Sequence, residues 1–132
     1  MPIRLPYFLL TLLPLAAELV NAAPKRLLSL DLCLDWMVAH YVPRAQVAAL
    51  SPMQQRYPID WVGGHWPTHD GSLEQIYALQ PDQILVGQFT NTQLRQRLQA
   101  LGLSVEVLPL PTTLAQVAAY ERQFLRAVRL PM

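Results

Sequence analysis

The sequence is poor in cysteine and in charged residues. Cys33 is the single cysteine among 132 residues, which excludes a disulfide within the chain and a metal site built from cysteines alone. Charged residues make up only 14% of the chain, against an average of about 25%. The formal net charge of +1 argues against nucleic acid as a partner, because nucleic-acid binders usually carry a basic domain or stripe. The length allows one ordinary domain, and 52% apolar residues are enough to bury a core.

Several catalytic and metal-binding patterns are also missing. The sequence contains no GxGxxG, no GxxxxGK[ST] and no GxSxG segment, so neither a phosphate-binding loop nor a serine hydrolase is indicated. His65 and His69 lie four residues apart, but Pro67 between them interrupts a regular helix. A zinc site needs three or four protein ligands, so two solvated loop histidines and no metal are expected.

The single cysteine lies between two acidic residues. Asp31 and Asp35 flank Cys33, and two nearby carboxylates raise the pKa of a thiol, the opposite of what activates a nucleophile. We therefore expect Cys33 to be a small buried residue. Asp31 or Asp35 is expected at a helix N-terminus, where the helix dipole favours a carboxylate.

The N-terminus has the pattern of a secretory signal peptide. Arg4 precedes an apolar run over residues 5–17, which is shorter than the roughly 20 residues of a membrane-spanning helix. A small-x-small cleavage pattern ends at Ala22. Residues 1–22 are therefore predicted to be removed on export, leaving 23–132 as the mature chain.

Beyond this segment, short apolar runs alternate with helical periodicity. The strands are expected at residues 26–30, 46–50, 83–86 and 104–108. The helices are expected at residues 31–41, 72–79, 92–101 and 114–128. This alternation predicts an α/β fold with a small doubly wound parallel sheet of about four strands and flanking helices. In such sheets ligands meet the loops at the carboxyl ends of the strands.

Local signals mark several helix ends. Ser72 is predicted to cap one helix, with Gln75 reaching back as in a capping box. Asn91 or Thr90 is expected to cap the next, and Gly102 to take the left-handed position after it. The last helix is expected to bury an apolar stripe made of Leu114, Val117, Ala118, Phe124, Leu125 and Val128.

Residues 51–70 form a long irregular segment, with a helical turn expected at 53–56. It carries Tyr57, Trp61 and Trp66, which we take as candidate ligand-binding residues from their position in a loop. Aromatic side chains there form a stacking platform for a large flat ligand. The alternative is that they pack the loop onto its own domain.

Three segments resemble one protein family. These are residues 71–86, which contain the pattern SLE-x-I-x-AL-x-PD, and residues 25–35 and 98–105. Together they resemble the N-terminal lobe of periplasmic substrate-binding proteins for cobalamin and ferric siderophores. These proteins deliver ligands to ATP-binding-cassette (ABC) importers. The resemblance runs from about residue 25 to residue 130, nearly the whole mature chain, and the predicted signal peptide agrees with a periplasmic location.

The resemblance implies a non-enzymatic binding protein of two α/β lobes joined by a helix, with the ligand between them. Cobalamin, a ferric siderophore or haem is the implied ligand. Glu74 matches the glutamate that docks on the permease in the inner membrane. Residues 23–132 correspond to the first lobe, and the second lobe is expected to be absent. The chain is then either a truncated product or fragment, or a single lobe that works with another chain, and weak or no ligand binding by it alone is expected.

Two other functions remain open at this stage. One is a periplasmic interaction module that docks on a permease or another chain without capturing a ligand. The other is a flavodoxin-like enzyme, against which the missing phosphate loop and the absence of an activated nucleophile both count.

Overall fold

The computed structural model describes residues 25–62 and 65–129. The predicted signal peptide lies outside them. A single sheet contains β1 (Leu27–Ser29), β2 (Val47–Ala49), β3 (Gln83–Gly87) and β4 (Val105–Leu108). Its strand order is β2-β1-β3-β4, and every pairing is parallel. The predicted four-stranded parallel sheet is therefore confirmed.

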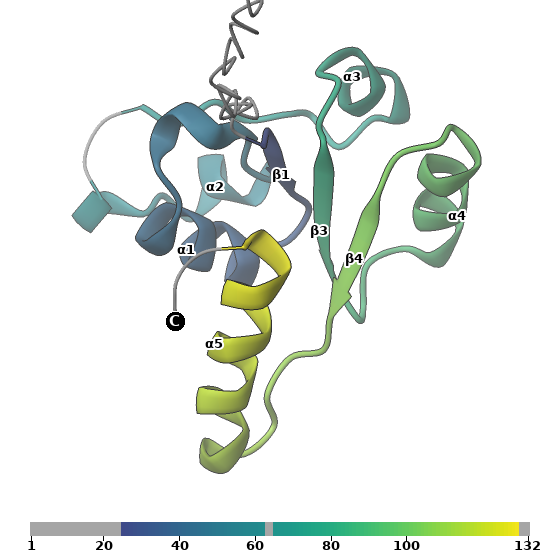
Figure 1. The fold of residues 1–132 in the computed structure, drawn as a ribbon. Coiled ribbons are helices and arrows are strands. Elements are labelled where there is room, and N and C mark those ends of the chain that lie inside the picture. The colour runs from purple at the N-terminus through teal and green to yellow at the C-terminus, as the bar shows by residue number, and fades with distance from the viewer. Residues whose placement is uncertain (1–24, 63–64, 130–132) are drawn as a thin grey trace, which may run out of the picture.

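Helices cover both faces of this sheet (Figure 1). The α-helices are α1 (Leu32–Tyr41), α2 (Met53–Arg56), α3 (Leu73–Ala78), α4 (Thr92–Ala100) and α5 (Leu114–Val128). Short 3-10 turns occupy Arg44–Gln46 and Asp60–Val62. One core cluster joins α1 and α5 to the sheet, and a second joins α3 and α4 to its other face. None of the helices in the described part of the chain has the length and apolar character that a membrane crossing requires.

The alternation of side chains along each strand divides the core. Leu27 and Leu85 enter the cluster beneath α1 and α5, whereas Leu28 and Ile84 enter the cluster beneath α3 and α4. Successive residues of a strand point to opposite faces of a sheet. Strands buried on both faces therefore read as continuous apolar runs, which is why the sequence pattern revealed them.

Most of the predicted helix ends are confirmed. The Ser72 side chain accepts a hydrogen bond from the Gln75 N–H at 3.2 Å, and the Asn91 side chain caps α4 in the same way. Gly102 has a φ of +80°, the left-handed conformation expected after α4.

The capping box at α3 is wrong in one detail. The Gln75 side chain accepts a hydrogen bond from the Asp70 N–H rather than from the Ser72 N–H. The Ser72 N–H instead donates to Asp70 Oδ1 at 2.8 Å. Asp70 therefore takes the place that Gln75 has in an ordinary capping box.

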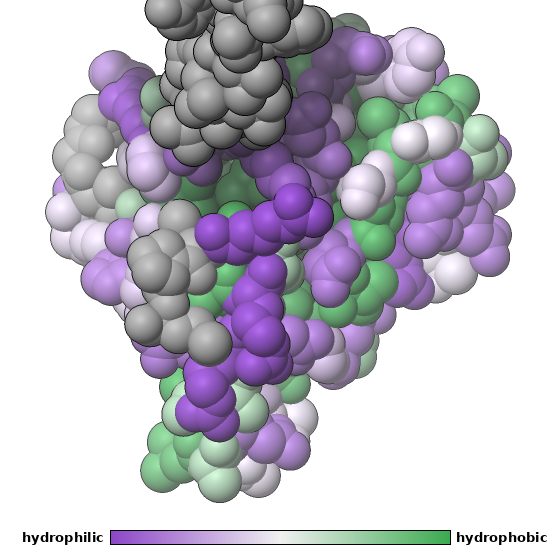
Figure 2. Space-filling model, viewed as in Figure 1, coloured by the Kyte–Doolittle hydropathy of each residue, from purple (hydrophilic) through white to green (hydrophobic). Residues whose placement is uncertain are grey.

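The first half of α5 does not pack as predicted. Leu114 and Val117 are 92% and 49% exposed, and Ala118 is exposed too, whereas Tyr120, Phe124 and the residues that follow on the same face are buried. Figure 1 shows the N-terminal end of α5 extending past β4, and Figure 2 shows apolar surface over that end. Periodicity identifies the apolar face of a helix but not how far the sheet beneath it reaches.

The long segment 51–70 is fastened where it begins and where it ends. The Leu50 N–H donates to the Pro67 carbonyl at 2.7 Å, and the His69 N–H donates to the Leu50 carbonyl at 3.1 Å. These bonds form a parallel bridge between Leu50 and Thr68. Between the two ends lies the helical turn expected at 53–56, which is α2.

Candidate functional site

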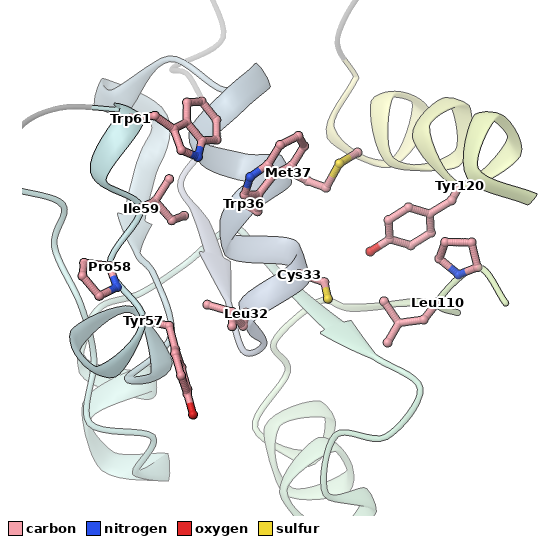
Figure 3. Close-up of a pocket in the computed structure, with 11 residues that line it drawn as sticks. Leu32, Cys33, Trp36, Met37, Tyr57, Pro58, Ile59, Trp61, Leu110 and Tyr120 are labelled. Carbon is pink, nitrogen blue, oxygen red and sulfur yellow. The ribbon is translucent and has the colours of Figure 1, made fainter. Parts of the chain in front are cut away.

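A largely apolar cavity of about 570 Å³ lies at the carboxyl-terminal edge of the sheet. Three segments form its walls: the first half of α1, the segment around 57–61, and the connection from β4 to α5 with one residue of α5 itself (Figure 3). The lining residues are Leu32, Cys33, Trp36, Met37, Tyr57, Pro58, Ile59, Trp61, Leu110, Pro111 and Tyr120. Each of these segments follows the carboxyl end of a strand, where ligands are expected to meet such sheets.

The structure brings two of the three predicted aromatic residues together. Tyr57 and Trp61 line the cavity and are 49% and 55% exposed. Trp66 does not line it. Its half-buried ring packs against the core cluster beneath α1 and α5, with the Arg44 guanidinium 5.6 Å from the ring centroid. The packing alternative therefore holds for Trp66, and ligand binding by Tyr57 and Trp61 stays a prediction.

Trp36 extends the aromatic wall and was not singled out from the sequence. Its ring meets the edge of Trp61 at a centroid distance of 5.3 Å and stacks on His40 at 5.3 Å with an interplanar angle of 10°. Trp36 is 45% exposed. The sequence did contain a signal for this residue. Trp36 and His40 are four residues apart on a helix that starts at the carboxyl end of a strand, so their rings were placed to stack beside a ligand-facing edge.

Cys33 is exposed and lines the cavity, so the expectation that it is buried was wrong. The next residue, Leu34, faces the core. Because successive residues of a helix point about 100° apart, the Cys33 side chain is directed away from the core. Partial desolvation raises the pKa of the Cys33 thiol above 9.0, and the carboxylates of Asp31 and Asp35 raise it further. The predicted direction of this shift is confirmed.

The two acidic residues near Cys33 have different roles. Asp31 is the N-cap of α1 and accepts a hydrogen bond from the Leu34 N–H at 2.9 Å, as expected of a residue at a helix N-terminus. Its carboxylate lies so close to Gly87, at the end of β3, that a side chain there would overlap it. Asp35 is buried and accepts hydrogen bonds from Ser51, so it belongs to the core rather than to the cavity.

The two histidines are not equivalent. His65 is exposed, but His69 is 1% exposed, so the expectation of two solvated histidines was wrong for His69. Its Nε2 lies 2.8 Å from the Ser29 carbonyl, and its Nδ1 accepts from the Gly71 N–H at 3.0 Å. His69 thus joins the segment 51–70 to β1. Residues 25–62 and 65–129 contain no group of three or more histidine, cysteine or acidic side chains placed to hold a metal ion.

Tyr120 is one of three buried residues in the lining of the cavity, together with Met37 and Ile59. It projects from α5 and is 8% exposed. Its hydroxyl is buried and has no hydrogen-bond partner among the described residues. Burial raises the pKa of the Tyr120 phenol, with smaller contributions from Asp31 and Cys33. The phenol is therefore a neutral group at physiological pH.

Glu74 lies apart from the cavity. It is exposed in the first turn of α3, where the helix dipole favours a carboxylate. A more polar hollow of about 350 Å³ adjoins it, bordered by residues from the start of α3 and from α4, Arg97 among them. The side chain is thus free to contact another surface.

The comparisons with known proteins concern the fold. No family model matches the sequence, and no curated protein matches it either. Among solved structures, the chain is similar to a periplasmic heme-binding protein from Pseudomonas aeruginosa, with a TM-score of 0.63 and 16% sequence identity. The match covers 83% of this chain and 40% of that protein. The chain therefore has the α/β fold of one lobe of a periplasmic binding protein and spans less than half of that protein's length.

Proposed function

We propose that this chain is the first lobe of a periplasmic solute-binding protein of an ABC importer, and that the cavity is its half of the ligand site. The observation that carries this proposal is the aromatic-walled cavity at the carboxyl edge of the sheet, which Trp36, Tyr57 and Trp61 line and in which the rings of Trp36 and Trp61 are in contact. The fold similarity to a periplasmic heme-binding protein and the family-like segment around Glu74 support it. In this role the chain is a binding protein rather than an enzyme.

The proposed ligand is a large compound with ring systems, with cobalamin, a ferric siderophore and haem as the candidates. A volume of about 570 Å³ falls within the usual range of small-molecule sites. Exposed indole and phenol rings offer stacking surfaces to such compounds. A single lobe encloses only one side of a ligand, so weak binding by this chain alone is expected.

Isothermal titration of the purified chain with each of the three candidates tests this function. Weak binding is expected for one candidate, and Trp61→Ala should reduce it about tenfold because stacking on one aromatic contributes about 1 kcal/mol or more. Trp66→Ala is the matched control, since Trp66 does not line the cavity. If Trp61→Ala binds as well as the native chain, the cavity is not the site. Tight binding would contradict the expectation that one lobe is insufficient.

Glu74 is proposed as the docking residue for the permease. Its exposure in the first turn of α3 leaves the carboxylate free to pair with arginine side chains. Co-purification with an importer permease should be lost in Glu74→Gln and retained in Glu106→Gln, which removes an acidic residue from β4 instead. Permease association without any ligand binding would favour the alternative function, an interaction module.

A further inference from the structure

The lining of the cavity contains a buried polar group without a hydrogen bond. The side chains of Trp36, Tyr57 and Trp61 are about half exposed, so their N–H and O–H groups can bond to water. Tyr120 is only 8% exposed, and its hydroxyl has no partner among the described residues. Of the four buried side-chain atoms that lack a partner in the described part of the chain, it alone belongs to a residue of the lining. Because buried polar atoms in native proteins are usually hydrogen-bonded, a bond to a ligand would account for this exception.

The Tyr120 hydroxyl is directed into the space between α5 and the start of α1. Figure 3 shows this hydroxyl and the Cys33 side chain pointing toward each other from two walls of the cavity, with Leu110 beside them. Burial is the main cause of the raised pKa of the Tyr120 phenol, followed by Asp31 and Cys33, and the contribution of Cys33 agrees with this placement. The unpaired hydroxyl therefore belongs to the end of the cavity where α1 and α5 face each other.

Both groups at this end of the cavity carry a hydrogen at neutral pH. The pKa of the Cys33 thiol and that of the Tyr120 phenol are raised above their ordinary values, in each case mainly by burial. A phenol O–H is a hydrogen-bond donor, and a thiol S–H is a weaker one. An oxygen that has no hydrogen of its own, such as a carbonyl oxygen, is therefore the ligand group that matches both of them.

The hydroxyl oxygen is covered by its neighbours in the structure, so a ligand atom reaches it only when an adjacent side chain turns aside. Leu110 is such a neighbour (Figure 3). It is half-buried and lies between β4 and α5, outside regular secondary structure. Changes of side-chain rotamer are common on binding even where the backbone moves little. Rotation of Leu110 would therefore open the hydroxyl to a ligand without a change of fold.

We propose that Tyr120 is a specificity-determining residue of the cavity, and that its hydroxyl donates a hydrogen bond to an acceptor oxygen, such as a carbonyl, on the bound ring compound. The proposal rests on the proposed function, since it describes the ligand of the same cavity. Because the hydroxyl is already unpaired, a compound without an acceptor loses nothing there, whereas a compound with one gains a bond. The aromatic wall binds the rings, and Tyr120 selects among compounds by the group they carry.

Two naphthalene compounds of the same shape test the proposal. The first, 2-acetonaphthone, carries a carbonyl group, and the second, 2-isopropenylnaphthalene, has a CH₂ group in place of the carbonyl oxygen. Equilibrium dialysis against the native chain and against Tyr120→Phe gives both dissociation constants for each protein. The two proteins are then compared by the ratio of these constants, because the difference in hydration between the two compounds cancels in that comparison.

Tyr120→Phe removes only an atom without a partner, so the variant should fold. It is expected to weaken the binding of 2-acetonaphthone about fivefold relative to that of 2-isopropenylnaphthalene, the effect of one neutral hydrogen bond. The matched control is Tyr77→Phe, which removes the hydroxyl of an exposed tyrosine in α3, on the other face of the sheet, and should leave the ratio unchanged. An unchanged ratio in Tyr120→Phe, or an equal change in Tyr77→Phe, overturns the role of Tyr120 but leaves the cavity as a ligand site. If neither compound binds the native chain, both this proposal and the proposed function are overturned.

Discussion

The backbone N–H and the hydroxyl of Ser51 both donate hydrogen bonds to the buried carboxylate of Asp35, at 2.8 and 2.6 Å. This pair joins α1 to the segment that leaves β2. Asp35→Ala would bury two unpaired donors, so it should lower the free energy of unfolding by about 2–4 kcal/mol. Urea denaturation measures the change. Ser51→Ala keeps the backbone bond and should lose less, about 1 kcal/mol; equal losses in the two variants would contradict this account.

The same carboxyl group predicts a pH dependence. Burial raises the pKa of Asp35 above its ordinary value of 3.8, although the hydrogen bonds from Ser51 oppose the rise. A carboxyl group whose pKa is higher in the folded state than in the unfolded state contributes most stability at low pH. That contribution falls as pH rises from the unfolded to the folded pKa.

Comparison with Asp35→Asn isolates this effect, because the amide does not titrate. The free energy of unfolding of the native chain, relative to that of the variant, should decrease between pH 4 and pH 7 in urea titrations. An increase over the same range would show that the pKa of Asp35 is lowered instead.

Two tyrosines near α5 should respond differently to loss of the hydroxyl. The Tyr120 hydroxyl is buried without a partner, so Tyr120→Phe should leave the free energy of unfolding unchanged or raise it by up to about 1 kcal/mol. The Tyr41 hydroxyl donates to the Glu121 carboxylate, so Tyr41→Phe should lower it by about 1 kcal/mol. Chemical denaturation of both variants at neutral pH checks this. A large loss in Tyr120→Phe would show that its hydroxyl has a partner.

Cys33 should react slowly for an exposed thiol. Only the thiolate is nucleophilic, and desolvation together with Asp31 and Asp35 raises the pKa of Cys33 above 9.0. At pH 8 the rate of alkylation by iodoacetamide should be lower in the folded chain than in the urea-unfolded chain, and it should keep rising above pH 9. Bound ligand should slow it further, because Cys33 lines the cavity. Faster alkylation of the folded chain would contradict the shift.

The sheet was predictable because most of its strand residues belong to short apolar runs between clear helix signals. Pro43 and Pro81 follow helices, and Gly102 has the positive φ that ends α4. The exposure of single residues was less predictable. Cys33 is exposed although its neighbour Leu34 in α1 is buried. Leu114 lies on the apolar face of α5 but is exposed, because the sheet does not extend beneath it. Both outcomes depend on tertiary geometry that local sequence does not contain.

The lining of the candidate cavity was predicted in part for similar reasons. Tyr57 and Trp61 were chosen because they lie in a long loop at the carboxyl edge, and both line the cavity. Trp36 was missed because it lies within a helix whose partners across the cavity are distant in sequence. Trp66 lies in the same long loop but immediately before the bridge between Leu50 and Thr68. That bridge returns the chain to the body of the domain before Trp66 can join the cavity wall.

The bridge between Leu50 and Thr68 also bears on how the shape of the cavity could be altered. The hydrogen bonds of this bridge hold the two ends of the loop 51–67 together, independently of the residues between them. Doubling the length of such a loop costs only about 0.6 kcal/mol in closure entropy. The loop that carries Tyr57 and Trp61 can therefore be replaced as a unit. A grafted or lengthened loop would change the shape of the cavity but would leave the strands and their register unchanged.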